Sequence, residues 1–168
     1  MKTIIKYSRL ILLHLGILLI ILGLTLGYFY NWRGKAVLLT TDKTNVFITS
    51  KKELKIVPYA LTLNQFNVDY FDTGEPKHFE AIIDVEENEQ TQTISLYVNH
   101  PCKMSFGADL YLISHHTLQP ENAPCCVVEL VYEPFQGVVL AGIILVLIGL
   151  CLMMVNDKWL LLRHQRYA

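Results

Sequence analysis

One histidine interrupts the first apolar segment of the chain. Residues 10–30 form an otherwise unbroken apolar run, and His14 is the only ionisable residue in it. About 20 apolar residues suffice to cross a bilayer as a helix, and an ionisable group inside such a span is costly. A neutral imidazole is a common metal ligand, so His14 is a candidate ligand. The alternative is an imidazole that reaches the aqueous interface, since His14 stands only about 6 Å into the helix.

Three cysteines and four histidines lie beyond this segment, in the middle of the chain. Cys102 stands alone and Cys125 and Cys126 are adjacent, which leaves open a disulfide from Cys102 to either, or a redox-active vicinal pair. No C-x-x-C occurs, which excludes a thioredoxin-like dithiol and a C-x-x-C-H haem attachment site. The histidines match no zinc spacing and are predicted to be surface or turn residues. They are His78, His100, His115 and His116.

The sequence contains no other arrangement that is typical of an active site. It has no Ser-His-Asp pattern, no glycine-rich phosphate loop and no basic patch that would suit nucleic acid. We therefore expect no catalytic residue in this chain and no nucleic-acid partner.

Two apolar segments, residues 10–30 and 136–155, divide the chain. The tails, residues 1–9 and 156–168, together carry six basic residues and one acid, whereas residues 31–135 carry eight basic and fourteen acidic residues. Short basic flanks stay in the cytoplasm, so we expect both termini inside and the middle domain outside the cytoplasmic (inner) membrane. The first segment is too long for the core of a cleaved signal peptide and lacks a small-x-small site, which favours a retained anchor.

Glycines mark one face of each predicted transmembrane helix. Gly16, Gly23 and Gly27 share a side of the first helix at 100° per residue, and the second helix offers a matching set of small residues. That set comprises Gly137, Ala141, Gly142 and Gly149. Small residues let helices approach closely in lipid, so we expect the two helices to pack together. His14 would then point away, toward lipid or another protein.

The middle domain has the pattern of an antiparallel β fold. Seven segments are rich in Val, Ile, Leu, Thr, Tyr and Phe, several alternate, and turn residues separate them. The segments are residues 35–41, 45–49, 59–70, 78–85, 91–98, 110–114 and 126–132. The predicted fold class is membrane α+β: two transmembrane helices flanking a β-rich domain, either a sandwich or an open barrel.

Four short motifs follow one another along the chain. They are residues 13–23 with His14, residues 57–70 (VPYALTLNQFNVDY), residues 74–79 (GEPKHF) and residues 98–101 (VNHP). In this order they resemble the ResB-like (CcsB) family of cytochrome c biogenesis proteins, over about residues 10–155. The first resembles the family's last transmembrane helix before the outer domain, and the others are similar to its "lPF-x-L-x-L-x-dF", "G-x-P-K-x-F" and "v-N-x-P" stretches. The motif residues are Pro58, Phe66, Gly74, Pro76, Asn99, Pro101, Gly107 and Tyr111. The chain departs from the family pattern at Cys102 and Leu112, and it resembles a short or split form.

The resemblance implies a haem-handling role. Such a protein would work with a CcsA/ResC-type membrane partner to bind and position haem for attachment to apocytochrome c. It implies that His14 is an axial ligand to the iron of a b-type haem shared with that partner, which is sound haem chemistry. The subunit would be a non-catalytic part of the cytochrome c synthase complex.

Two other functions fit the residues. The first is a membrane-anchored scaffold whose outer domain binds a partner without haem. The second is a thiol-redox membrane protein that uses Cys125 and Cys126.

Overall fold

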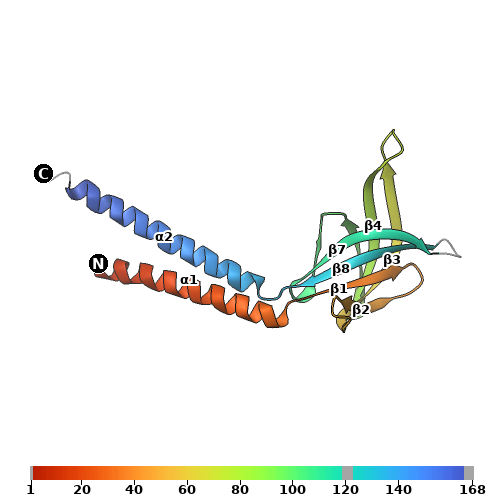
Figure 1. Ribbon diagram of the computed structural model, residues 1–168, viewed down its shortest axis with the longest axis horizontal. Coiled ribbons are helices and arrows are strands. Elements are labelled where there is room, and N and C mark those ends of the chain that lie inside the picture. The colour runs from red at the N-terminus through yellow and green to blue at the C-terminus, as the bar shows by residue number, and fades with distance from the viewer. Residues whose placement is uncertain (1, 119–122, 165–168) are drawn as a thin grey trace. The chain divides into compact units, whose positions relative to one another are not determined.

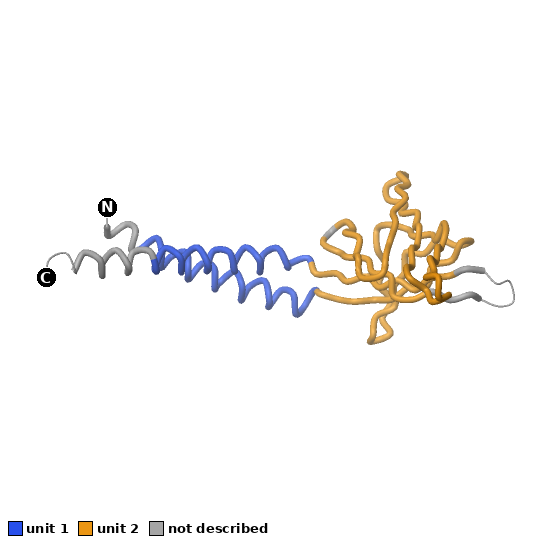
Figure 2. The backbone as a smooth tube through the Cα atoms, turned by 90° about the horizontal axis from the view of Figure 1, so that it is seen from above, with its two compact units in different colours: residues 1–30, 134–168 blue, residues 31–133 orange. Residues whose placement is uncertain are grey.

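The structure is a computed structural model, and it describes residues 2–118 and 123–164. The described chain divides into two compact units. One unit is helical and is built from both ends of the chain, Met1–Tyr30 and Pro134–Ala168. The other unit, Asn31–Glu133, is the β domain (Figure 2).

The helical unit consists of two long helices, α1 (Lys2–Tyr30) and α2 (Gln136–His164). Their apolar portions, Tyr7–Tyr30 with 24 residues and Gln136–Met154 with 19 residues, are long enough to cross a membrane. α2 begins just after Pro134, and the carbonyl of Phe135 accepts hydrogen bonds from the amides of Val138 and Val139.

Glycines set the contact between the two helices. A methyl group on Gly16 would lie 2.7 Å from the carbonyl oxygen of Gly142, and the reverse distance is the same. A methyl group on Gly23 would lie 2.6 Å from a side-chain carbon of Val139, and one on Gly149 would lie 2.9 Å from a side-chain carbon of Leu13. The predicted packing is therefore confirmed, with one correction on α2. Gly137 has open space around it and Ala141 is exposed, because both lie off the face that contacts α1.

The β domain is one eight-stranded sheet in the order β5-β4-β3-β2-β1-β8-β7-β6, and every pair is antiparallel (Figure 1). Its strands are β1 (Trp32–Leu39), β2 (Thr44–Thr49), β3 (Leu54–Tyr70), β4 (Pro76–Glu87), β5 (Gln90–Tyr97), β6 (Cys102–Met104), β7 (Ala108–Leu118) and β8 (Ala123–Tyr132). All seven predicted strands are present. The sequence did not predict β6 or the single turn of 3₁₀ helix at Ser105–Gly107, because segments of three residues carry no period.

A single core fills the concave side of the sheet. Alternate side chains of the strands point into it, among them Leu38, Phe47, Leu63 and Leu110, each with no exposed surface. β5 and β7 lie against each other, yet the two end strands β5 and β6 do not pair. The predicted α+β fold class is thus confirmed, and of its two options the open barrel describes the domain.

The hairpin of β3 and β4 extends beyond the core (Figure 1). Beyond a register shift between Leu63 and Gln65, no residue of β3 is buried. Phe66 and Phe79 pack across the projecting part, with ring centroids 6.3 Å apart. Its turn exposes Tyr70 and Phe71.

Candidate ligand site on the first helix

His14 is exposed on α1, and its ring is held by its own helix. The Nδ1 atom lies 2.6 Å from the carbonyl oxygen of Leu10, one turn earlier. A carbonyl oxygen can only accept, so Nδ1 must donate, and the neutral ring then carries its free lone pair on Nε2. Metal-binding histidines usually have their other nitrogen fixed in this way. This hydrogen bond therefore selects, for the neutral ring, the tautomer that a metal ligand needs.

The surface around His14 is apolar and shallow. It is lined by Tyr7, Leu10, Ile11, Leu15 and Leu18, all from α1. Such a surface offers dispersion contacts to a flat apolar group, and no charged side chain among its lining residues competes for a metal.

His14 lies on the side of α1 that faces away from α2. The buried glycines Gly16 and Gly23 are about 200° and 180° around the helix from it, at 100° per residue. Thr25 shares the side of His14, and its hydroxyl donates to the carbonyl of Ile21 at 2.7 Å. The predicted orientation of His14 away from the glycine contact is confirmed.

Nothing in the described residues completes a metal site at His14. No group of three or more His, Cys, Asp or Glu side chains able to hold a metal ion occurs there. The residues that line the surface around His14 include no second His, Cys, Asp or Glu, so a metal there would need a further ligand from outside this surface.

Arg9 has a structural role that sequence reasoning missed. It belongs to the basic flank that was predicted to stay in the cytoplasm. In the structure the residue is only 8% exposed, and its guanidinium donates to the carbonyl of Leu152 at 3.5 Å. No residue pattern in the sequence marks this contact, because it depends on how α1 and α2 pack. Arg9 therefore joins α1 to α2 at the end of the hairpin that holds both chain termini.

The sheet separates the cysteines that were candidates for a disulfide. Cys102 in β6 is opposite Leu110, which is opposite Leu130, so β7 lies between β6 and β8. Leu130 is four residues from Cys126, which adds about 13 Å along the strand to two strand spacings of about 4.8 Å. A disulfide needs Cα atoms within about 7 Å. The predicted link from Cys102 to the vicinal pair is therefore incompatible with this register.

The vicinal cysteines are also poor redox groups. Cys125 and Cys126 are 2% and 0% exposed. Burial raises the pKa of the Cys126 thiol to about 12, with a smaller contribution from Cys125. Because the thiolate is the reactive form, such a thiol is inert at neutral pH.

Two histidines of the β domain, His78 and His100, have described side chains, and neither belongs to a group of three or more side chains that could hold a metal ion. His78 and His100 are exposed, and the ring of His78 packs against Tyr97 with centroids 5.0 Å apart. His115 and His116 lie in β7 opposite Cys126 and Cys125, and their side chains are outside the described part of the structure.

A polar network on β3, β4 and β5 was not predicted. The Glu80 carboxylate accepts hydrogen bonds from Asn67 Nδ2 at 3.0 Å and from the Tyr97 hydroxyl at 2.7 Å. These bonds, Asn67 first, lower the pKa of Glu80. Asn67, Glu80 and Tyr97 each point outward from their strand. They meet because Asn67 is opposite Glu80 and Glu80 is opposite Tyr97 in the register of β3, β4 and β5.

Several motif residues occupy backbone positions that limit the choice of side chain. Gly74 (φ +84°) and Gly107 (φ +76°) are left-handed, as is Asn99 (φ +65°). Gly107 also accepts a hydrogen bond at 3.0 Å from the amide of Glu133, at the end of the domain. Pro76 begins β4, Pro58 is exposed in β3, Pro101 precedes β6, and Tyr111 is opposite Glu129.

The fold and site define a class: a membrane protein with a β domain inserted between two apolar helices, and one imidazole exposed on the first. The sequence matches the ResB-like family over residues 7–128, well over half of the chain. The protein belongs to this family, and membership implies a role in cytochrome c biogenesis. A comparison with curated proteins gives no match.

Proposed function

We propose that this protein is a subunit of a membrane cytochrome c maturation complex, in which His14 supplies one axial ligand to haem. The observation that carries the proposal is the hydrogen bond from His14 Nδ1 to the Leu10 carbonyl. It leaves Nε2 as the ligand atom on an exposed, apolar side of α1. Haem iron with two imidazole ligands is a stable arrangement, and α2 does not obstruct this side.

The partners in this proposal are a CcsA/ResC-type membrane protein and apocytochrome c. The membrane partner would cover the exposed side of α1 and provide the second axial imidazole, since no other His lines the surface around His14. Haem would be the cargo, whose vinyl groups are attached to the cysteines of apocytochrome c. Attachment requires close positioning of the reactants, which is the contribution expected of a subunit without catalytic groups.

The basic tails support a topology with both termini in the cytoplasm and the β domain outside. Alkaline phosphatase fused after Val98 is expected to be active, because that enzyme folds only on the outer side. An inactive fusion at Val98 together with active fusions at the termini would reverse the topology.

The ligand role is tested by co-expression of the full chain with a CcsA/ResC-type partner, followed by purification and haem spectroscopy. His14→Ala is expected to abolish or shift the Soret band of the complex. Thr25→Ala is the matched control, because Thr25 is on the same exposed side and also bonds a main-chain carbonyl. Imidazole added to a His14→Gly complex should restore the band. An unchanged spectrum in His14→Ala would overturn the ligand role.

The other two functions give different results in the same preparation. A scaffold without haem predicts an intact complex with no Soret band in the wild type. A thiol-redox function predicts that Cys125→Ser/Cys126→Ser stops cytochrome c assembly, which the burial of both thiols argues against.

A further inference from the structure

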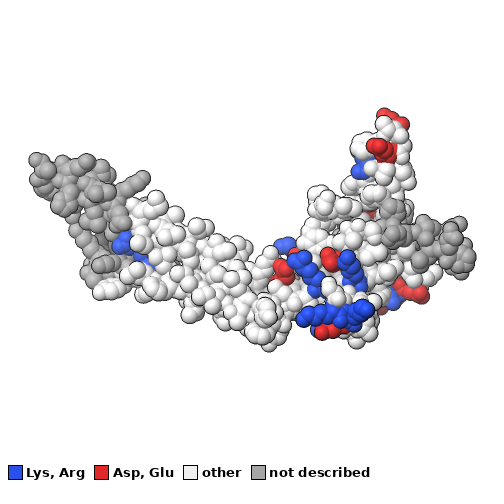
Figure 3. All heavy atoms as spheres, in the orientation of Figure 1, with Lys and Arg blue, Asp and Glu red and all other residues white. Residues whose placement is uncertain are grey.

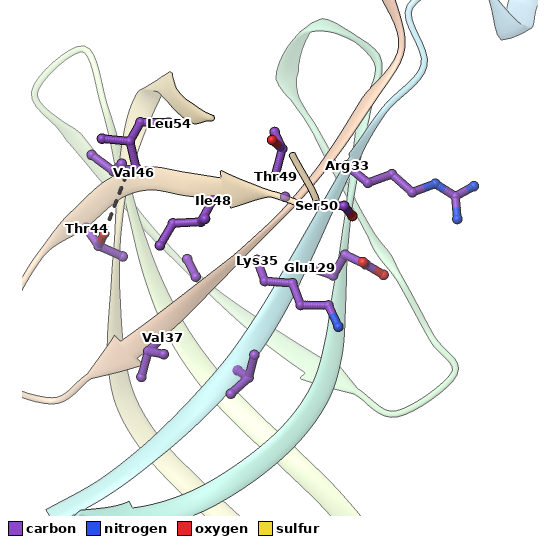
Figure 4. Close-up of a pocket in the computed structure, with 13 residues that line it drawn as sticks. Arg33, Lys35, Val37, Thr44, Val46, Ile48, Thr49, Ser50, Leu54 and Glu129 are labelled. Carbon is purple, nitrogen blue, oxygen red and sulfur yellow. Dashed lines mark hydrogen bonds between the residues drawn. The ribbon is translucent and has the colours of Figure 1, made fainter. Parts of the chain in front are cut away.

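A groove opens on the outer face of the sheet between β1 and β2. These strands pair only at Gly34↔Thr49 and Lys35↔Ile48, and beyond that point β2 turns away from β1 (Figure 4). The groove has a volume of about 650 Å³, within the range of small-molecule sites. It lies on the face opposite the core, since the lining residues Arg33, Lys35 and Val37 alternate with buried positions of β1.

The floor of the groove is apolar although it faces outward. Val37, Ile48 and Leu54 are 52%, 54% and 67% exposed, and Val46 and Val127 complete the surface. Five apolar side chains from four strands therefore form one exposed surface. Apolar surface that gathers in this way, instead of being scattered, marks a binding site.

The rim of the groove is basic. Six of the eight Lys and Arg residues of the β domain lie within residues 33–55, which contain only two acids. The rest of the domain is strongly acidic. Figure 3 shows the basic side chains gathered over the part that contains β1 and β2, and acidic ones at the tip of the β3–β4 hairpin. Arg33 and Lys35 line the groove, where Arg33 is paired with Glu133 at 3.5 Å and Lys35 is opposite Glu129, which also lines it. Lys51 and Lys52, exposed in the turn that follows the lining residues Thr49 and Ser50, supply the excess charge, whereas Lys55 is paired with Glu53.

This basic rim is close to the membrane along the chain. Arg33 follows Tyr30, the last residue of α1, by three positions, a distance of at most about 10 Å. The β2–β3 turn with Lys51 and Lys52 lies beside it, because Gly34 is opposite Thr49. Arg33 would therefore lie within reach of the headgroups of a membrane that α1 spans.

We propose that this groove binds an anionic phospholipid. The phosphate would lie at the basic end of the groove, between Arg33 and Lys35 on β1 and the turn that carries Lys51 and Lys52, and part of an acyl chain would cover Val37, Val46 and Ile48. The combination of an apolar floor and a basic rim favours this occupant. A free anion would leave the apolar floor uncovered, and a neutral lipid would leave the basic rim without a counter-charge. The site is independent of the haem-ligand proposal, because it uses no residue of α1.

Hydrogen exchange of the full chain in nanodiscs tests this proposal. Backbone amides of residues 36–48 are expected to exchange several-fold more slowly in discs that contain phosphatidylglycerol than in discs of phosphatidylcholine alone. Inorganic phosphate added to the phosphatidylcholine discs is the second arm. Equal protection in the two lipids, or protection by phosphate alone, would overturn the proposal.

Variants locate the effect in the groove. Lys35→Gln removes charge from the rim and Ile48→Asp makes the floor polar, so both should lose the protection that phosphatidylglycerol gives. Lys103→Gln and Ile113→Asp are the controls, because these exposed residues lie on β6 and β7, outside the groove. If the controls lose protection as fully as the groove variants, the effect is general attraction to the membrane and the site does not exist.

Discussion

Gly16 and Gly142 meet backbone to backbone, and each lies where a single added methyl group would come within 2.7 Å of the other's carbonyl oxygen. Real side chains do not tolerate that distance from a main-chain atom, so the helices must separate if either glycine is replaced. This contact also fixes which side of α1 carries His14 outward. The close packing of α1 against α2 and the exposure of His14 are thus consequences of the same orientation of α1.

Replacing Gly16 or Gly142 with alanine should weaken the helical hairpin. We expect a loss of about 1–3 kcal/mol, typical of overpacking a close contact. Gly137→Ala is the control, because a methyl group there meets nothing within 4 Å. The measurement is the midpoint of unfolding as SDS is added to the protein in a mild detergent. Equal midpoints in Gly16→Ala and Gly137→Ala would show that the close contact is absent.

Gly74→Ala should destabilise the β3–β4 hairpin although there is room for the methyl group. Gly74 has φ +84° and open space around it, so the cost is conformational and of about 1 kcal/mol. Gly74→Asn should cost less, because asparagine tolerates this backbone region. Urea unfolding of the two variants in detergent gives the comparison. Asparagine as damaging as alanine would point to a role for Gly74 other than its φ angle.

Stability should depend on the charge of Glu80. Hydrogen bonds from Asn67 and Tyr97 lower the pKa of Glu80 below its ordinary value of 4.5. The folded state therefore gains stability from the carboxylate that is complete above the unfolded pKa and is lost as pH falls through the lowered folded pKa. Glu80→Gln should be less stable than wild type at pH 6, and the difference should shrink below about pH 4.5. Denaturation midpoints across this pH range measure the effect, with Asp72→Asn, in the exposed turn, as the control.

The Cys126 thiol should resist alkylation in the folded protein. It is 0% exposed and burial raises its pKa to about 12, so little thiolate forms at pH 8. Cys102, which is partly exposed, should react faster despite a pKa that burial and Asp109 also raise. Mass spectrometry after timed maleimide labelling distinguishes the two. Rapid labelling of Cys126 before unfolding would reopen a redox function for the vicinal pair.

Periodicity was sufficient to predict the elements of this fold. Alternation located every long strand of the β domain, and the glycine stripe placed Gly16 and Gly23 against α2. The ligand candidate was also evident, because His14 is polar in an apolar run. The tautomer of the His14 ring could not be predicted, because it depends on a hydrogen bond to the carbonyl of Leu10, one turn away.

Features that depend on register could not be predicted from single segments. Glu80, Asn67 and Tyr97 come from three strands and meet only through their pairing. The same pairing separates Cys102 from Cys126, although the 23 intervening residues would easily allow a disulfide in a flexible chain. The groove arises where β2 leaves β1, and no sequence pattern marks that divergence.

Trp32 and Tyr132, the first residue of β1 and the last of β8, are directly opposite each other, with ring centroids 5.8 Å apart. The two points at which the chain enters and leaves the β domain are therefore neighbours. A domain with adjacent ends can be inserted into a host at one loop without separating the parts on either side. In engineering terms the β domain is a cassette in a helical hairpin: it could be exchanged for a short linker while α1 and α2 keep their contact.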